Sequence, residues 1–182
     1  MERGFSLIEV LVASTLMTVA LIALAQLSVA SIRMNQVARL TTVTTVLASQ
    51  KIEQLQALTW AFDAAGAPVS DTTTDTSVAP EQSAGGTGLA PSPAEALVQD
   101  TTGYCDFLDA RGRPLVHSVG AGTAPPSATA FVRRWSIQTL PTVDGLLIQV
   151  SVARRGTHAA LSNVHTRPGE ARMIVLKTRK SG

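Results

Sequence analysis

The sequence predicts an α+β fold in which one long N-terminal helix, half transmembrane and half amphipathic, packs on a small antiparallel β-sheet. Three observations support this expectation. No Pro or Gly interrupts the chain between Phe5 and Ala65, so a helix can run through that stretch. Residues 103–182 contain runs in which apolar and polar side chains alternate, as they do in strands with one buried face. Between these regions, residues 63–102 hold few large apolar side chains.

The first helical segment, residues 5–32, is expected to span a membrane. From Val10 to Ile32 the chain has 23 residues without a charge, and only Gln26 among them is strongly polar. A hydrocarbon core of about 30 Å needs about 20 apolar residues of helix. This stretch is therefore long enough to cross a bilayer.

Residues 33–62 are expected to continue the same helix in amphipathic form. A continuous helix from about Phe5 to Leu58 would be roughly 80 Å long, at about 1.5 Å per residue. The apolar side chains of the second half recur mostly at three- or four-residue spacing, which is typical of a helix with one buried face. They are Leu40, Val43, Leu47, Ile52, Leu55 and Leu58.

Residues 63–102 are expected to form a long mobile loop of low complexity. They are rich in Ala, Gly, Pro, Ser and Thr, and such a composition buries too little apolar surface to offset the entropy of ordering. The loop carries six acidic residues and no Lys or Arg, a charge of −6. Residues 131–182 hold nine basic and two acidic residues, a charge of +7. The overall charge of +2 therefore conceals two oppositely charged regions.

Residues 103–182 are expected to form the sheet. A strand near Cys105 and a turn at residues 109–112 come first, followed by three further runs, FVRRWSIQTL, LLIQVSVARR and ARMIVLKTRK. In the first of these, alternation places Phe131, Arg133, Trp135 and Ile137 on one face. A sheet this small needs something to pack on, and the amphipathic half of the helix is the obvious candidate.

The sequence predicts no enzyme, no metal site and no cofactor. The single cysteine, Cys105, excludes an intrachain disulfide. His117, His158 and His165 lack the spacing of metal ligands. The glycine-rich stretches lack the strand–loop–helix context of a phosphate-binding loop. Structural and binding roles are therefore favoured over catalysis.

The N-terminal stretch MERGFSLIEVLVA admits three ordinary interpretations. Ser6 and Glu9 fit a helix capping box, although a cap leaves the preceding Arg3-Gly4 step unexplained. A small-residue site at positions 28–30 resembles the cleavage site of a secretory signal peptide, but Glu9 lies inside the apolar region and the helical pattern continues through the cut. A plain single-span anchor is the third interpretation.

Taken together, the same residues resemble the class III signal of type IV prepilins and pseudopilins. They combine a short basic leader, Gly followed by Phe, a Glu four residues later and a long uncharged run. The resemblance implies that a prepilin peptidase removes residues 1–4 by cutting between Gly4 and Phe5, and then N-methylates Phe5. It also implies that Glu9 pairs with the charged amino terminus of a neighbouring subunit during assembly. Such a pair would account for a carboxylate that costs about 2.5–3.5 kcal/mol near the centre of a span.

The resemblance extends, less specifically, to the whole architecture. The run VLASQKIEQLQAL followed by late strands ending in Arg and Lys is similar to PilV-type minor pilins and to the minor pseudopilins of type II secretion. The absence of a proline midway along the apolar segment and of a second cysteine favours a minor subunit over the principal pilin. The implied function is a structural subunit that joins a type IV pilus or a related fibre, or primes or modulates its assembly.

The implied partners are the prepilin peptidase/methyltransferase, other pilins or pseudopilins through the N-terminal helix, and the bacterial inner membrane before assembly, with the C-terminal domain in the periplasm. DNA is a less favoured partner. Its phosphates would need a cluster of cations, and the candidates are Arg154, Arg155, Lys177, Arg179 and Lys180. A solvated sheet face partly neutralised by the acidic loop is the competing explanation of these charges. A membrane-anchored or secreted binding domain unrelated to fibres also stays open.

Overall fold

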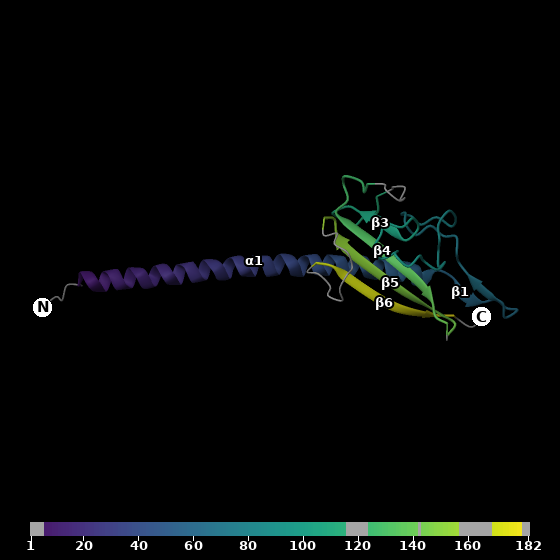
Figure 1. Ribbon diagram of the computed structural model, residues 1–182, viewed down its shortest axis with the longest axis horizontal. Coiled ribbons are helices and arrows are strands. Elements are labelled where there is room, and N and C mark those ends of the chain that lie inside the picture. Colours follow the sequence, from purple (N-terminus) through teal and green to yellow (C-terminus); the bar gives the residue numbers. More distant parts are fainter. Residues whose placement is uncertain (1–5, 116–123, 142, 157–168, 180–182) are drawn as a thin grey trace. The chain divides into compact units, whose positions relative to one another are not determined.

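The computed structural model of the chain describes residues 6–115, 124–141, 143–156 and 169–179. Within these ranges it contains one helix and six strands (Figure 1). The chain divides into two compact units, Met1–Arg39 and Leu40–Gly182, here called unit 1 and unit 2. The helix, α1 (Leu7–Ala57), begins in unit 1 and ends in unit 2.

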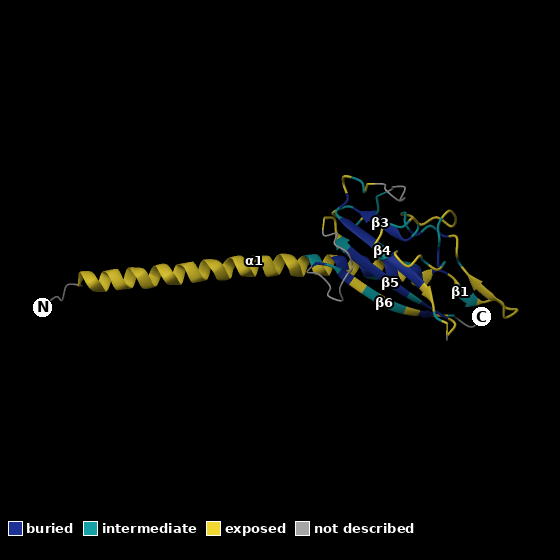
Figure 2. Cartoon of the chain, in the orientation of Figure 1, coloured by how far each residue is buried: buried dark blue, intermediate teal, exposed yellow. Residues whose placement is uncertain are grey.

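α1 is a single α-helix of 51 residues, which confirms the predicted long N-terminal helix. Within unit 1 its apolar side chains are exposed all around the helix (Figure 2). Consecutive residues illustrate this, since Leu16 and Met17 are 66% and 67% exposed. By length and composition α1 is the one helix in the described residues that could cross a membrane, and the most apolar window has a mean hydropathy of 2.3 with no buried residue.

α1 ends within one residue of the predicted end of the continuous helix, Leu58, but before residue 62, the end of the predicted amphipathic segment. Residues 33–62 were expected to be helical, but α1 stops at Ala57, and β1 (Trp60–Phe62) pairs antiparallel with β2 (Pro68–Ser70). The turn between these strands explains why residues 60–62 belong to a hairpin and not to the helix. The Asp63 carboxylate accepts hydrogen bonds from the backbone N–H groups of Ala65 and Ala67 at 2.9 and 2.7 Å, a turn-forming pattern that competes with a helix.

Unit 2 contains a four-stranded antiparallel sheet in the order β3–β4–β5–β6 (Figure 1). Its strands are β3 (Cys105–Leu108), β4 (Phe131–Thr139), β5 (Gly145–Arg154) and β6 (Ala171–Thr178). The turn after β3 is closed by the Gly112 N–H, which donates to the carbonyl of Asp109 at 3.0 Å. The α+β fold class predicted from the sequence is thereby confirmed.

One face of this sheet packs on the second half of α1. Trp135 lies opposite Val150, and Ile137 opposite Ile148, across β4 and β5, and all four side chains are fully buried. Burying one such side chain contributes about 1.5–3 kcal/mol, so this face supplies most of the core. The residues that α1 adds to the same core are Leu47, Ala48, Ile52 and Leu55.

The opposite face of the sheet is buried at one end only. Cys105, Phe107 and Val132 form a second, smaller buried cluster, whereas Ile174 and Leu176 on β6 are 60% and 51% exposed. The expectation of a single buried face is therefore wrong at the edge of the sheet formed by β3 and β4. A strand covered on both sides does not alternate, and all four residues of β3 are buried.

Residues 63–102 were expected to be a mobile loop, and the structure corrects this to an irregular but packed segment. Leu89 and Ala96 are 1% and 0% exposed and belong to the main core. The Ser92 N–H donates to the carbonyl of Ile137, whose own N–H donates to the Ser92 hydroxyl, so the segment extends the edge of β4 beyond β3. Composition underestimated the order because backbone and hydroxyl groups can attach an apolar-poor segment to a sheet.

Two glycines mark the end of unit 2 at which α1 enters, here called the entry end. Gly112 has a φ of 76°, and an added Cβ would lie 2.7 Å from Cδ2 of Leu47. At Gly169 an added Cβ would lie 3.3 Å from Cβ of Leu40, the first residue of unit 2. The turn after β3 and the chain before β6 therefore both lie directly against the first turns of α1 in unit 2.

Candidate processing and assembly segment

The start of α1 forms the backbone part of the predicted cap. The carbonyl of Ser6 accepts hydrogen bonds from the N–H groups of Glu9 and Val10 at 3.0 and 3.2 Å, so Ser6 occupies the N-cap position. Among the described residues, neither the Ser6 hydroxyl nor the Glu9 carboxylate makes a hydrogen bond. The side-chain half of the predicted capping box is thus not formed there.

Glu9 lies in the first turn of α1 and is exposed. The partial positive charge of a helix N-terminus favours a carboxylate at this position. The next charged residue along α1 is Arg33, about 36 Å away at about 1.5 Å per residue. No ion pair joins Glu9 to a cation in the described part of the chain. A carboxylate at the edge of a long uncharged helix is therefore available to a positive group from outside that part.

Gly4 and Phe5, the predicted processing residues, lie outside the described residues. Their assignment therefore rests on the sequence and on the comparison reported below.

Four hydroxyl groups in the apolar part of α1 are satisfied within the helix. Ser14 and Thr15 donate to carbonyls three residues earlier at 2.9 and 2.8 Å, and Thr18 and Ser28 to carbonyls four residues earlier at 2.8 and 2.9 Å. In hydrocarbon an unsatisfied polar group costs several kcal/mol. These bonds make the four hydroxyl groups compatible with a lipid or protein environment.

A buried ionic cluster attaches the second half of α1 to the sheet. Asp106 on β3 accepts bonds from Arg133 on β4, at 2.9 Å from Nε and 2.6 Å from Nη2, and from Lys51 of α1 at 3.0 Å. The Arg133 Nη1 group also donates to the carbonyl of Leu47 at 2.9 Å. The side chains of Lys51 and Asp106 are 0% and 1% exposed, so the cluster is closed to solvent.

Lys51 joins three parts of unit 2. Its ammonium group donates to the carbonyl of Thr76 in the irregular segment and lies 4.0 Å from the centre of the Trp135 ring, a cation–π contact. Burial lowers the Lys51 pKa from 10.5 to about 8, even though the negative charge of Asp106 acts to raise it. Sequence reasoning missed this cluster, although two signals were present: Lys51 falls on the apolar face of the helix and Arg133 on the apolar face of β4.

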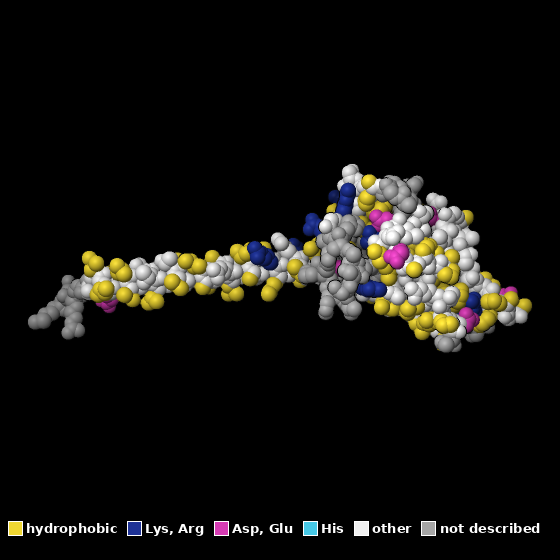
Figure 3. All heavy atoms as spheres, viewed as in Figure 1, with side chains coloured by type: hydrophobic (Ala, Val, Ile, Leu, Met, Phe, Trp, Pro, Cys, Tyr) yellow, Lys and Arg dark blue, Asp and Glu magenta, His cyan; other side chains and the backbone are white. Residues whose placement is uncertain are grey.

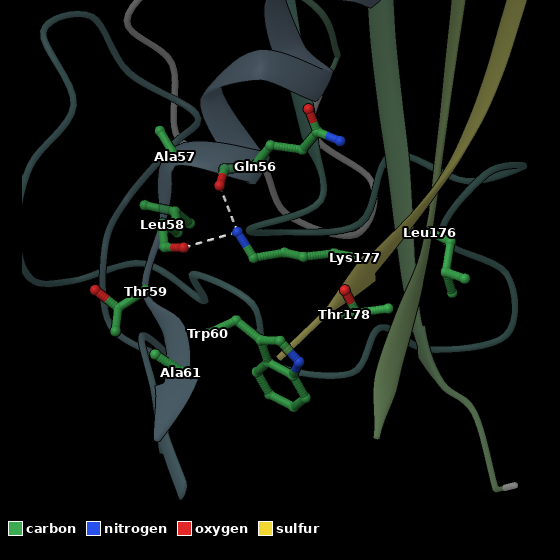
Figure 4. Close-up of a pocket in the computed structure, with 9 residues that line it drawn as sticks. All are labelled: Gln56, Ala57, Leu58, Thr59, Trp60, Ala61, Leu176, Lys177 and Thr178. Atoms are coloured by element: carbon green, nitrogen blue, oxygen red, sulfur yellow. Dashed lines mark hydrogen bonds between the residues drawn. The ribbon is translucent and has the colours of Figure 1, made fainter. Parts of the chain in front are cut away.

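Lys177 lies at the C-terminal end of α1 and Arg179 at the β1–β2 hairpin, although both were predicted as possible DNA contacts. Lys177 is 9% exposed, and its ammonium group donates to the carbonyls of Gln56 and Leu58 in the region where α1 ends (Figure 4). A cation is favourable there because the last carbonyls carry partial negative charge. A pocket of about 520 Å³ lies beside this contact, lined by residues 56–61 and 176–178 (Figure 4).

Arg179 is bound in a similar way. Its guanidinium carbon lies 3.7 Å from the centre of the Trp60 ring, and its Nε donates to Asp144 at 2.7 Å. The Arg179 side chain is only 8% exposed. These contacts attach the β1–β2 hairpin to the end of β6, and they leave little of the guanidinium for a polyanion.

The five predicted nucleic-acid residues do not form one surface. Arg154 at the end of β5 is exposed, as is the adjacent Arg155, but Lys177 lies opposite Leu146, eight residues earlier on β5. Eight residues of strand span about 26 Å, so these cations lie at opposite ends of the sheet. Lys180 lies outside the described residues.

Cys105 has the environment of a structural cysteine. It is fully buried, and burial together with the nearby charge of Asp100 raises the pKa of its thiol. A thiol that stays protonated is a poor nucleophile. Within the described residues no three His, Cys, Asp or Glu side chains gather as they would around a metal ion, and the three histidines lie outside those residues.

Comparison with known proteins supports the interpretation of the N-terminus. Residues 1–25 match the family described as the prokaryotic N-terminal methylation motif. Comparisons with curated proteins and with solved structures found no match. The matched residues include the predicted cleavage position, Glu9 and the first part of α1. The chain therefore carries, on a fold of pilin-like layout, the N-terminal processing signal of type IV prepilin-like proteins.

Proposed function

We propose that the chain is a minor pilin or pseudopilin, a structural subunit without catalytic activity. Prepilin peptidase cuts it between Gly4 and Phe5 and N-methylates Phe5, and α1 then incorporates the subunit into a type IV pilus or a related fibre. The observation that carries this proposal is the methylation motif at residues 1–25, placed directly on a helix whose apolar side chains are exposed.

The two parts of α1 have different roles in this proposal. Before assembly the apolar part in unit 1 anchors the subunit in the inner membrane, and unit 2 lies in the periplasm. During assembly the same surface packs on the helices of neighbouring subunits. Glu9 then pairs with the positive amino terminus of Phe5 in a neighbour, and methylation keeps that charge. The second half of α1, held by Lys51 and Lys177, carries the sheet with it.

A minor subunit is favoured over the principal pilin on two grounds. The apolar segment has no proline midway, and the single cysteine cannot close a disulfide in the C-terminal region. The candidate machines are a type IV pilus, a competence fibre and the type II secretion pseudopilus. DNA uptake has less support among them, because Lys177 is engaged at the end of α1 and Arg179 at the β1–β2 hairpin.

Mass spectrometry of the mature N-terminus tests the processing step. In a host with prepilin peptidase we expect a chain that begins with methylated Phe5, and Gly4→Leu should abolish this product. Ser6→Ala, on the other side of the cut, is the matched control and should be processed normally. A mature chain that begins at Ser31 would instead establish cleavage by signal peptidase and refute the proposal.

Recovery in sheared fibres tests the assembly role of Glu9. Glu9→Ala should be processed but recovered in fibres at a strongly reduced level, because the carboxylate no longer pairs with a neighbouring amino terminus. Glu53→Ala removes the same charge from an exposed position in the part of α1 within unit 2 and should assemble normally. Equal recovery of the two variants would contradict the assigned role.

A further inference from the structure

Five exposed arginines gather at the entry end of unit 2. They come from three places in the sequence: the turn after β3, the end of β5 and the start of β6. We call them the arginine collar, and they are Arg111, Arg113, Arg154, Arg155 and Arg172. Figure 3 shows Lys and Arg side chains gathered over this end of unit 2.

The fold places these residues together. The turn that holds Arg111 and Arg113 contains Gly112, which lies against Leu47 of α1. Strand register brings the end of β5 to the start of β6, because Val152 pairs with Ala171. The chain before β6 lies against Leu40 through Gly169. Each part of the collar is therefore tied to the segment where α1 enters unit 2.

Positive charge exceeds negative charge at this end. The described carboxylates there are Asp109, which pairs with Arg113 at 2.9 Å, and Glu170, which accepts a bond from Ser151 at 3.3 Å. Five arginines against two carboxylates leave a net charge of +3. By contrast, residues 63–102 carry six acidic and no basic side chains. The basic and acidic side chains of unit 2 thus come largely from different segments of the chain.

The entry end is close to the uncharged span along the chain. Leu40 comes eight positions after Ile32, which is about 12 Å of helix whatever the orientation of unit 2. The headgroup layer adds about 5–7 Å on each side of the hydrocarbon core, and the Debye length at physiological salt is about 8 Å. The part of the collar beside Gly169, which lies against Leu40, is therefore within electrostatic reach of lipid phosphates. Arg33 and Arg39 lie in the connecting stretch and are exposed.

We propose that the arginine collar binds the phosphates of anionic lipids and docks unit 2 on the membrane surface before assembly. This inference rests on the membrane anchoring in the proposed function. Planar guanidinium groups suit phosphate because they donate two parallel hydrogen bonds. Arg155 is oriented by bonds from Nη1 to the carbonyls of Pro126 and Ser127, and Arg172 by a bond from Nη2 to Gln149. These bonds use only part of the five donors of each guanidinium.

A lipid surface fits the collar better than the other polyanions. DNA would have to reach a site held next to the bilayer by a short segment of chain, and two further DNA candidates, Lys177 and Arg179, lie at the far end of the sheet. The acidic segment of a second copy has the right charge, but it becomes a neighbour only when copies gather. A membrane around α1 is present from the moment of anchoring.

Fluorescence quenching of the full chain in vesicles tests the proposal. A fluorophore is placed on Ala128→Cys, an exposed site near Arg155, with Cys105→Ala removing the native thiol. The vesicles contain phosphatidylcholine alone or an equimolar mixture with phosphatidylglycerol, each with the same trace of nitroxide-headgroup lipid. We expect stronger quenching in the anionic vesicles, and an effect that weakens as salt is added.

Charge variants identify the residues responsible. Arg154→Gln with Arg155→Gln should lower the ratio of docked to undocked unit 2 about 30-fold, since each arginine near an anionic surface contributes about fivefold. The matched control is Gln138→Glu with Thr178→Glu, which makes the same change in net charge at exposed positions away from the collar. The control should keep the extra quenching. Near-UV circular dichroism checks that both variants are folded.

Four results would overturn the proposal. The first is equal quenching in the two kinds of vesicle, and the second is extra quenching that persists in the Arg154→Gln, Arg155→Gln variant. The third is quenching that depends on protein density but not on lipid composition. The fourth is arginine-dependent binding of duplex DNA that does not depend on phosphatidylglycerol. Carbonate extraction separates these outcomes from a failure of anchoring. If the unmodified chain is extracted from the vesicles, the anchoring in the proposed function fails, whereas retention with equal quenching refutes only the collar.

Discussion

Asp106 is the carboxylate on which two buried cations converge, and Asp106→Asn removes its charge while keeping its shape. In the native protein the Asp106 Oδ2 atom lies 2.6 Å from Nη2 of Arg133 and 3.0 Å from Nζ of Lys51. The amide that replaces it still offers one oxygen, but it also presents an N–H group where the carboxylate accepted bonds. Two cations then remain buried without a counter-charge.

The magnitude follows from the burial of all three groups. Removing one partner of a buried ion pair typically costs about 3–5 kcal/mol, because it leaves an uncompensated charge. The side chains of Lys51, Asp106 and Arg133 are 0%, 1% and 6% exposed, so solvent does little to screen the loss. A cost of about 4 kcal/mol lowers the folding equilibrium constant roughly a thousandfold and is a large part of the 5–15 kcal/mol typical of a domain.

Urea unfolding of the full chain in detergent, followed by tryptophan fluorescence, measures this cost. Trp135 is fully buried beside Lys51, so its emission reports the loss of the cluster. Arg113→Met is the control: it breaks an ion pair whose arginine side chain is 69% exposed and should cost less than about 1 kcal/mol. Adding Lys51→Met to Asp106→Asn should recover part of the stability, because one uncompensated charge is removed.

Two results would refute this reasoning. If Asp106→Asn costs no more than Arg113→Met, the cluster does not stabilise unit 2. If Lys51→Met lowers the stability of Asp106→Asn further, the uncompensated ammonium is not the source of the cost.

Three further predictions concern unit 2. Burial lowers the Lys51 pKa to about 8 in the folded protein, while the unfolded chain keeps the ordinary value. The unfolded state therefore binds more protons above pH 8. The free energy of unfolding should rise with pH by up to about 3 kcal/mol towards pH 10.5. The experiment is done in Cys105→Ala, since the raised thiol pKa acts in the opposite direction, and a rise that persists after Lys51→Met would contradict the assignment. Lys177→Met should cost about 2–4 kcal/mol, because the carbonyls at the end of α1 lose a charged donor, and hydrogen exchange should accelerate first at residues 55–62. Gly112→Ala should lower the free energy of unfolding in urea more than Gly66→Ala does. Both glycines have positive φ, but only at position 112 would the added Cβ contact α1. Equal losses would show that Leu47 moves aside without cost.

The elements that depend on local pattern were predictable from the sequence. An uninterrupted apolar stretch indicated α1, and alternation indicated β4, β5 and β6. The end of the continuous helix was predicted to within one residue, but β1 was not predicted, because the turn built on Asp63 that pairs it with β2 has no apolar pattern. The packing of Leu89 and Ala96 was missed because composition averages over a segment, while burial depends on the few side chains that reach the core.

The candidate site divides in the same way. Gly4, Phe5 and Glu9 were predicted from the sequence, because a processing signal is a short continuous stretch and a sequence displays such a stretch directly. The roles of Lys51, Asp106 and Arg133 were not predicted. These residues are separated by up to 82 positions, and they become one cluster only when a helix, two strands and a loop pack around them. Lys177 and Arg154 are both cations near the ends of strands in the sequence. The antiparallel register of β5 and β6 places Lys177 near the C-terminal end of α1 and Arg154 at the entry end of unit 2. This placement, which only the tertiary structure shows, gives the two cations different contacts.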